Sequence, residues 1–450
     1  MTPYLPHTQA DIRAMLDRCG LEDLDDLYAD VPESLKLKRP YDLPAPKSEE
    51  EVREYFKSLA DNCFPMTCFA GYGFYDHYAP AVVQSIISRS EFLTAYTPYQ
   101  PEVSQGTLQY IFEYQSMMCS LTGLDVSNAS MYDGSTALAE AMMMCVAASK
   151  KRNRVLVSGT LTPMYVNVMM TYAHYHGITL DLIPDRDGVT DLDILYGMLG
   201  EGDVAGVVLA TPNVYGILED FTGVAESVHK AKALLVITTP ASALAVLKTP
   251  AEWGADIAAG EAQSLGMPLS YGGPGLGYMC CTKALMRKLP GRIVGATTDA
   301  EGRRVFVLTL QAREQHIRRD KATSNICSNQ GLMALYAAVY LSLMGPEGMR
   351  EVNRLSCDGA HELARRLCET GLFEMTYPDK PYLNEFLLTY RGQSPLDEFV
   401  VRCFDAEILP GAIVGDDKLL VAVTERRSAK DIDTYVNMAT LFTQFESEED

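Results

Sequence analysis

Several common catalytic and metal-binding motifs are absent from this sequence of 450 residues. Its 11 cysteines form no CxxC pair and no repeating frame, so neither a disulfide scaffold nor a cysteine zinc site is expected. His361 and Glu362 begin an HExxH pattern, but Arg365 stands in place of the second histidine, which excludes a zincin site. The sequence also has no Walker A loop, no GxGxxG and no GxSxG. We therefore expect no metal site and no P-loop, dinucleotide-binding or serine-hydrolase chemistry of these kinds.

The chain also has little positive charge and no long apolar run. Its 59 acidic residues outnumber its 38 lysines and arginines, and the formal net charge is −21. Because nucleic acid and anionic membranes repel an acidic surface, we expect neither as a partner. The acidic N-terminal region lacks both the apolar core of a signal peptide and the arginine-rich character of a transit peptide. These features predict a soluble, cytoplasmic protein.

Short apolar segments alternate with amphipathic ones in the middle of the chain. Strands are predicted at 154–159, 179–184, 204–212 and 234–240, and helices at 166–177, 192–199 and 221–233. This alternation predicts an α/β fold with a mostly parallel sheet covered by helices on both faces. We divide the chain into an N-terminal helical arm that packs on a neighbour (1–65), a large α/β domain (66–330) and a small C-terminal α+β domain (331–450). In the arm, helices are expected at 12–20, 21–31 and 49–61, the last with Ser48 as N-cap and Glu51 completing a capping box.

Residues 254–277 read GADIAAGEAQSLGMPLSYGGPGLG, an apolar strand end followed by a glycine-rich turn. Glycine at this density permits positive φ angles and close approach of the backbone. The segment resembles the lysine segment of the fold-type I pyridoxal-phosphate (PLP) enzymes, in which a lysine holds the cofactor as a Schiff base. In that register the lysine position falls on Gln263, and the aspartate that pairs with the pyridine nitrogen falls at Thr238 and Thr239. The resemblance implies a cofactor scaffold without its lysine and its aspartate.

Two other segments are candidates for binding an anion. A helix is predicted to begin at Asp133-Gly134-Ser135-Thr136, where free N–H groups attract negative charge, although an ordinary capped helix explains the same residues. A basic cluster is followed by a polar run: Arg313, His316, Arg318, Arg319 and Lys321, then Thr323, Ser324 and Asn325. For the basic side chains we favour an internal ion-pair network. For the polar run we favour a site that binds a phosphate or a carboxylate.

The loop Tyr96-Thr97-Pro98-Tyr99-Gln100-Pro101 contains two prolines, which exclude both a helix and a central strand. It is either a rigid surface loop whose tyrosines only pack, or a substrate loop. Tyrosine suits the second interpretation because it offers an apolar ring with a hydroxyl at its tip. Composition alone does not choose between the two.

Four segments identify a more specific resemblance. They are AYTPYQPEVSQG (95–106), PLSYGGPG (268–275), PGRIVGATTDAEG (290–302) and AREQHIRRDKATSNIC (312–327). They resemble the N-terminal half of glycine decarboxylase, the P-protein of the glycine cleavage system, strongly from about residue 66 to 330. Long P-proteins contain two homologous halves, so a half-sized chain resembles the α subunit of the two-chain form. The resemblance implies a fold-type I, aspartate aminotransferase-like fold.

The same resemblance implies partners and roles. The β subunit (subunit 2) would carry the lysine and bind PLP covalently, in a complex of α2β2 type that acts on glycine and on the lipoyl H-protein. This chain alone would have no catalytic residue. Tyr96, Tyr99 and Gln100 would reach the substrate or interface site, and Thr323, Ser324 and Asn325 would lie near the phosphate of the partner's PLP. The alternatives are a self-sufficient enzyme of the same fold, which Gln263 argues against, and an inactive binding or regulatory protein.

Overall fold

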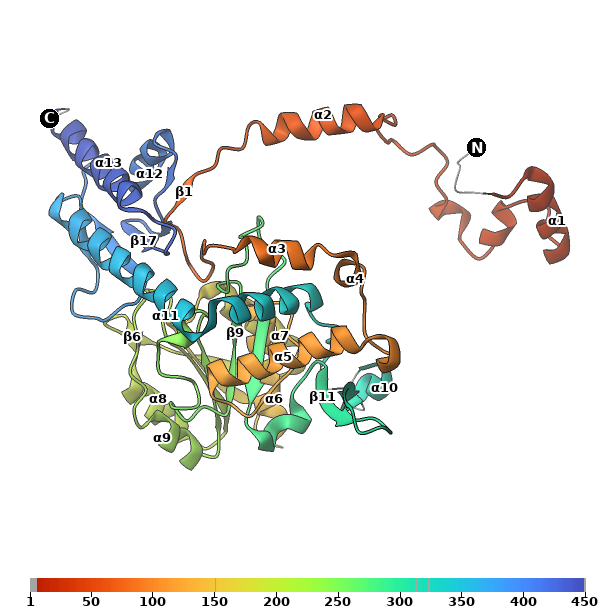
Figure 1. Cartoon of the computed structure of the whole chain (residues 1–450), viewed down its shortest axis with the longest axis horizontal. Helices are drawn as coiled ribbons and strands as arrows, with labels where there is room; N and C mark the ends of the chain where they lie inside the picture. Colours follow the sequence, from red (N-terminus) through yellow and green to blue (C-terminus); the bar gives the residue numbers. More distant parts are fainter. Residues whose placement is uncertain (1–5, 150, 312–314, 323, 449–450) are drawn as a thin grey trace. The chain divides into compact units, whose positions relative to one another are not determined.

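The computed structural model describes residues 6–149, 151–311, 315–322 and 324–448, and the chain forms two compact units, Met1–Phe64 and Pro65–Asp450. In the N-terminal unit, helices α1 (Gln9–Cys19) and α2 (Glu49–Ala60) each begin with a capping box (Figure 1). The box at Ser48 was predicted, and the one at Thr8 was not. Between them lie only short 3-10 turns, η1 (Asp25–Tyr28) and η2 (Glu33–Leu35).

The helix expected at 21–31 is therefore wrong, and the cause is local. Asp23 accepts hydrogen bonds from the N–H groups of Asp25 and Asp26 at 2.7 and 3.2 Å, and Asp26 accepts from the N–H of Glu22 at 2.8 Å. Aspartate side chains that bond to nearby N–H groups compete with the helical pattern. The acidic run consequently forms a turn.

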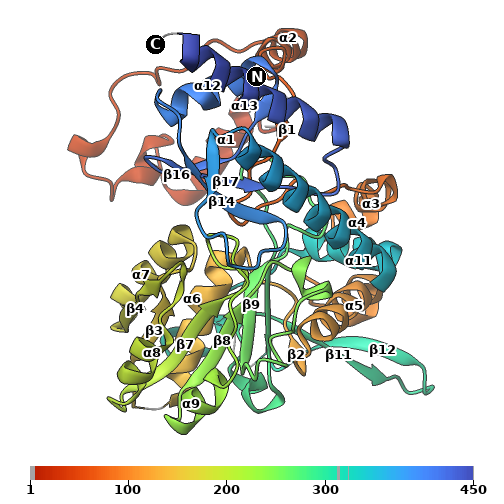
Figure 2. The same ribbon diagram turned by 90° about the vertical axis from the view of Figure 1, so that its left-hand side faces the viewer.

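A seven-stranded sheet organises the second unit, with strand order β2-β10-β9-β8-β7-β3-β4. Its strands are β2 (Val126–Ser127), β3 (Arg154–Ser158), β4 (Thr179–Ile183), β7 (Val204–Ala210), β8 (Leu234–Thr238), β9 (Ile257–Glu261) and β10 (Gly277–Cys281). The pairs from β4 to β9 are parallel, and β10 is antiparallel to both β9 and β2. The predicted mostly parallel sheet is confirmed, and Figure 2 shows its strands side by side.

Helices cover both faces of this sheet because successive strand residues point to opposite sides. In β3, Val155 and Val157 pack into the core with α6 (Gly134–Ser149) and α7 (Pro163–His176), whereas Leu156 packs into the core with α8 (Leu192–Leu199) and α9 (Val224–Lys230). A third core joins α3 (Ala81–Ile87), α5 (Gln105–Thr122) and the first part of α11. The second unit also contains the hairpin β11 (Ile293–Thr298)–β12 (Arg304–Thr309) and the short elements α4 (Ser90–Leu93), η3 (Pro101–Val103), β5 (Asp185–Arg186), β6 (Val189–Thr190), η4 (Ala243–Ala245), η5 (Lys283–Lys288), α10 (Gln315–Arg318) and η7 (Arg319–Lys321).

The C-terminal region begins with the long helix α11 (Gly331–Glu369), which is interrupted at Gly345 (φ 58°) and Pro346. Its second part packs on an antiparallel sheet of order β13-β14-β17-β16, together with α12 (Leu396–Asp405) and α13 (Ala429–Glu448). The strands are β13 (Phe373–Met375), β14 (Glu385–Tyr390), β16 (Ala412–Gly415) and β17 (Lys418–Ala422), and β1 (Thr67–Cys68) pairs with β15 (Ile408–Leu409). The domain boundary at residue 330 stays a prediction.

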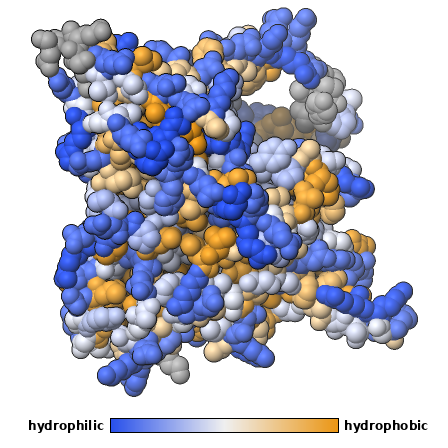
Figure 3. All heavy atoms as spheres, turned by 60° about the vertical axis from the view of Figure 1, so that its left-hand side comes forward, coloured by the Kyte–Doolittle hydropathy of each residue, from blue (hydrophilic) through white to orange (hydrophobic). Residues whose placement is uncertain are grey.

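Hydrophilic residues are interspersed with separate apolar patches on the face drawn in Figure 3. Within the described ranges, no helix has the length and apolar character that a membrane-spanning segment needs.

Candidate functional site

Gln263 lies two residues beyond the end of β9, at the edge of the sheet where the parallel strands end. The side chain is 2% exposed. Its amide nitrogen donates to the carbonyl oxygens of Tyr75 (2.9 Å) and Met267 (2.6 Å), and its amide oxygen accepts from the N–H of Tyr75 (2.9 Å). Both amide hydrogens are used, so Gln263 holds the backbone at Tyr75 against the end of the sheet.

Glu261, the last residue of β9, places its carboxylate at the beginning of α6. One oxygen, Oε2, accepts from the N–H of Gly134 at 2.9 Å. The other, Oε1, accepts from the N–H groups of Ala262, Gln263 and Leu276 at 3.1, 2.9 and 2.8 Å. Burial raises the pKa of Glu261, and the N–H bonds oppose that rise. The candidate anion site at the start of α6 thus already holds a carboxylate of the same chain.

Asp133 caps the same helix in the ordinary way. Its Oδ1 accepts from the N–H of Thr136 at 2.8 Å and from the hydroxyl of Ser135 at 2.5 Å. The capped-helix interpretation of this segment is therefore correct for Asp133. The contribution of Glu261 was missed, because that residue lies 127 positions further along the sequence.

Two threonines stand at the end of β8, where the resemblance places the aspartate. The Thr239 hydroxyl donates to the carbonyl oxygen of Thr211 at 2.8 Å, and the Thr239 carbonyl accepts from the Tyr278 hydroxyl at 2.6 Å. Thr238 lines a cavity between the sheet end and the C-terminal region. Neither side chain carries the negative charge that would pair with a protonated pyridine nitrogen.

That cavity is small. It offers about 40 Å³ to the centres of water molecules, which is room for a few waters. It is lined by Tyr72, Gly73, Tyr75, Leu161, Thr162, Tyr165, Ala210, Pro212, Asn213, Val214, Thr238, Pro240, Glu261 and Glu385. The absent lysine, the absent aspartate and the carboxylate at the start of α6 all conflict with PLP at this position. The residues present here do not fit the cofactor.

A second buried carboxylate, Glu385 at the start of β14, also faces the cavity. It accepts from the N–H of Tyr72 at 2.6 Å and from the hydroxyl of Tyr75 at 2.9 Å. Burial raises its pKa from 4.5 to about 7, and the two hydrogen bonds oppose that rise. Sequence reasoning missed Glu385, although a lone glutamate opening the apolar run EFLLTY was a usable signal.

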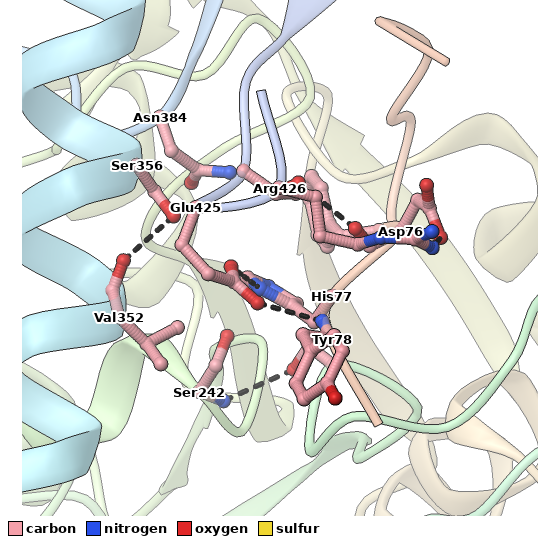
Figure 4. A network of polar contacts seen from close by, with 12 residues as sticks. Asp76, His77, Tyr78, Ser242, Val352, Ser356, Asn384, Glu425 and Arg426 are labelled. Carbon is pink, nitrogen blue, oxygen red and sulfur yellow. Dashed lines mark hydrogen bonds and ion pairs between the residues drawn. The ribbon is translucent and has the colours of Figure 1, made fainter. Parts of the chain in front are cut away.

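Further contacts fix the residues that follow Tyr75. The His77 ring (Nδ1) lies 2.6 Å from Oε2 of Glu425, and the N–H of Tyr78 donates to Oε1 of Glu425 at 2.6 Å (Figure 4). Asp76 forms ion pairs with Arg426 and, at 2.9 Å, with Arg427. Residues 72–78, which we call the connecting segment, therefore bond both to the sheet end and to the C-terminal region.

The predicted tyrosine loop lies elsewhere, on the surface. Tyr96 is 77% exposed and Tyr99 is 56% exposed, and Gln100 is also exposed. The guanidinium of the buried Arg292 donates to the Tyr99 hydroxyl at 3.3 Å and lies 5.4 Å from the centre of its ring. The same guanidinium donates to the Ser328 hydroxyl at 3.0 Å, so Arg292 joins the loop to the segment after Asn325. None of these side chains lines the cavity described above.

The predicted polar run is only partly described. Ser324 donates to Glu140 at 2.8 Å and accepts from the N–H of Ile326 at 3.1 Å, Asn325 is exposed, and Thr323 lies outside the described residues. Of the basic cluster, Arg313 is also outside. Arg318, Arg319 and Lys321 are exposed and make no ion pair with other described residues, so the expected internal network is not found for these three.

Solved structures of several PLP-dependent enzymes share this architecture. A glutamate decarboxylase from Lactobacillus brevis is 13% identical, with a TM-score of 0.68 over 92% of this chain and 96% of that chain. An alanine–glyoxylate aminotransferase from Nostoc sp. is 14% identical, with a TM-score of 0.61 over 94% and 100%. The protein therefore has the fold of the fold-type I PLP-dependent enzymes.

Closer similarities define the family. The family model for the glycine cleavage system P-protein matches residues 2–439. A crystal structure of glycine decarboxylase (P-protein) in inhibitor-bound form is 42% identical, with a TM-score of 0.88 over 98% of this chain and 100% of that chain. The chain belongs to the P-protein family of the glycine cleavage system.

Curated relatives match almost the full length of the chain. A protein of Geobacillus thermodenitrificans is 47% identical over 96% of this chain and 98% of its own length. One of Carboxydothermus hydrogenoformans is 46% identical over 97% and 98%. Both are named "Probable glycine dehydrogenase (decarboxylating) subunit 1".

Proposed function

We propose that this chain is the subunit of a two-chain glycine decarboxylase that does not carry the cofactor. The complex would decarboxylate glycine and transfer the aminomethyl group to the lipoyl group of the H-protein. The observation that carries the proposal is Gln263, which stands at the lysine position and whose amide is fully used in bonds to Tyr75 and Met267. An amide nitrogen cannot form a Schiff base.

The names of the relatives support a second subunit, since they number this one as subunit 1. The partner would be a homologous β subunit that binds PLP through its lysine, in a cytoplasmic α2β2 complex. PLP, when bound there, supplies the electron sink for the carbanion that remains after loss of CO2. This chain would complete the partner's site.

The tyrosine loop is the contribution we assign to this chain. Its prolines fix the backbone, so presenting the exposed Tyr96 and Tyr99 to a partner site costs little ordering entropy. Because Arg292 donates to the Tyr99 oxygen, the Tyr99 hydroxyl proton remains available for the carboxylate of glycine. The tyrosine rings would exclude water around that contact. Gln100 would lie at the rim.

The polar run would serve the cofactor. Asn325 is exposed, and the Ser324 hydroxyl beside it donates to Glu140 in this chain. Thr323 and Asn325 would donate hydrogen bonds toward the phosphate of the partner's PLP, and Ser324 would join them by exchanging its bond to Glu140 for one to the phosphate.

Reconstitution tests the proposal. The full chain and the candidate β subunit are assayed separately and mixed, with glycine, H-protein and PLP, for glycine-dependent CO2 release. We expect activity only in the mixture, a native mass corresponding to α2β2, and pyridoxyl-lysine only on the β chain after borohydride reduction and peptide mapping. A stoichiometric pyridoxyl adduct on this chain would refute the assignment, and separate monomers at micromolar concentration would refute the complex.

A further inference from the structure

The start of α6 has the features of a phosphate site. The helix is 16 residues long, and its first residues are Gly134, Ser135 and Thr136. The N-terminus of a helix attracts anions through its free N–H groups and the helix dipole. The N–H groups of Ala262, Gln263 and Leu276, from the turn after β9 and from the residue before β10, converge on the same point.

Two glycines leave room for an anion at this point. A Cβ on Gly275 would lie 3.1 Å from Oε2 of Glu261, and a Cβ on Gly134 would lie 2.7 Å from the hydroxyl oxygen of Tyr165. Tyr165 is 91% buried and lines the cavity, and its hydroxyl makes no hydrogen bond to any other described residue. A further donor thus faces the space beside the four N–H groups.

Glu261 fills this site from within the chain. Its carboxylate takes all four N–H bonds at 2.8 to 3.1 Å, and the residue is 96% buried. No arginine or lysine pairs with it among the described residues, so the backbone N–H groups provide its charge compensation. The carboxylate is therefore held as a bound anion would be.

The geometry points to Glu261 as a built-in anion that occupies the phosphate position of this half and prevents it from accepting a phosphate-bearing cofactor. The inference deepens the proposed function, on which its biological meaning rests. A P-protein pair contains two copies of one fold. Loss of the lysine removes covalent attachment, but a free phosphate site would still bind the cofactor or inorganic phosphate. A resident carboxylate removes that competition, so the cofactor loads only into the partner.

The test uses the full chain and inorganic phosphate. Removing the carboxylate in Glu261→Ala should open the site, so one phosphate per chain should bind by isothermal titration, whereas the natural chain should bind none. Saturating phosphate should also raise the melting temperature of Glu261→Ala by about 3 °C relative to chloride at the same ionic strength. Glu140→Ala is the matched control, because Glu140 is equally buried but is bonded to the Ser324 hydroxyl and to no backbone N–H.

Glu261→Gln separates shape from charge. The glutamine side chain still fills the site, so this variant should bind no phosphate. It lacks the negative charge that the four N–H groups compensate, so its free energy of unfolding should be lower than that of the natural chain. If Glu261→Ala does not fold in chloride, refolding from urea with phosphate should recover it. The inference is overturned if the natural chain binds phosphate stoichiometrically, if Glu261→Ala gains no more from phosphate than Glu140→Ala does, or if phosphate fails to refold it. These results are independent of glycine-dependent CO2 release by the assembled pair, which decides the proposed function.

Discussion

Replacing Gln263 by alanine should destabilise the chain and loosen the connecting segment. The change removes three hydrogen bonds and leaves the N–H of Tyr75 and the carbonyl of Met267 without a partner, whereas the carbonyl of Tyr75 keeps its bond from the N–H of His77 at 3.0 Å. Each buried polar group left unpaired costs about 1–3 kcal/mol, and part of this cost is recovered by relaxation. We therefore expect the free energy of unfolding to fall by about 3–5 kcal/mol.

Gln115 provides a matched control. It is also buried, and its amide pairs in the same two-bond way with the backbone of one residue, Val294 (3.0 and 2.9 Å). Gln115→Ala loses two bonds in place of three, so its loss of stability should be smaller, about 2–4 kcal/mol. The two variants differ in where the backbone opens.

Urea denaturation measures the stability, and hydrogen exchange followed by mass spectrometry locates the opening. Gln263→Ala should accelerate exchange in peptides that contain Tyr75, and Gln115→Ala in peptides that contain Val294. The reasoning is wrong if Gln263→Ala changes stability by less than about 1 kcal/mol or leaves exchange around Tyr75 unchanged.

Three further predictions concern the tyrosine loop, Glu385 and the lysine position. Tyr96→Phe or Tyr99→Phe should lower glycine turnover of the assembled complex at least about tenfold, equal to about 1.4 kcal/mol, with unchanged PLP content; near-normal turnover would mean that these tyrosines only pack. Burial raises the folded-state pKa of Glu385 from its ordinary 4.5 to about 7. Its contribution to the free energy of unfolding is therefore fully present below pH 4.5, and it decreases by about 3 kcal/mol in all as the pH rises through 7. Glu385→Gln should therefore flatten the fall in stability between pH 5 and 7.5, and an unchanged slope in urea denaturation would contradict the assignment. Gln263→Lys alone should give no pyridoxyl-lysine in this chain after borohydride reduction, and a stoichiometric adduct would show that the pocket still accepts the cofactor.

Local patterns were sufficient to predict the parallel strands β3, β4, β7 and β8 of the sheet. The apolar runs at 154–159, 204–212 and 234–240 are too short for helices and are separated by amphipathic segments, so strand identity followed from length and periodicity. The capping box at Ser48 and Glu51 was equally local, because all of its donors and acceptors lie within three residues. The aspartates at 23–26 misled the same reasoning, since their side chains compete with the helix for backbone N–H groups.

The site depended on long-range contacts that no local pattern contains. Gln263 and Tyr75 are 188 positions apart, and Tyr75 and Glu385 are 310 positions apart. The sequence pattern indicated that residue 263 could not be the Schiff-base lysine, but it contained no information on what its amide would bind. Likewise the free N–H groups at the start of α6 were predictable, whereas the identity of the anion was not.

The connecting segment has a consequence for assembly. Tyr72 and Tyr75 bond to Glu385, Tyr75 also bonds to Gln263, and His77 and Tyr78 bond to Glu425. The C-terminal region cannot shift relative to the sheet end without breaking these bonds together, so small independent displacements are suppressed. A second subunit would then dock on a surface that is already ordered. Little conformational entropy would be lost on association, and more of the contact energy would remain as affinity.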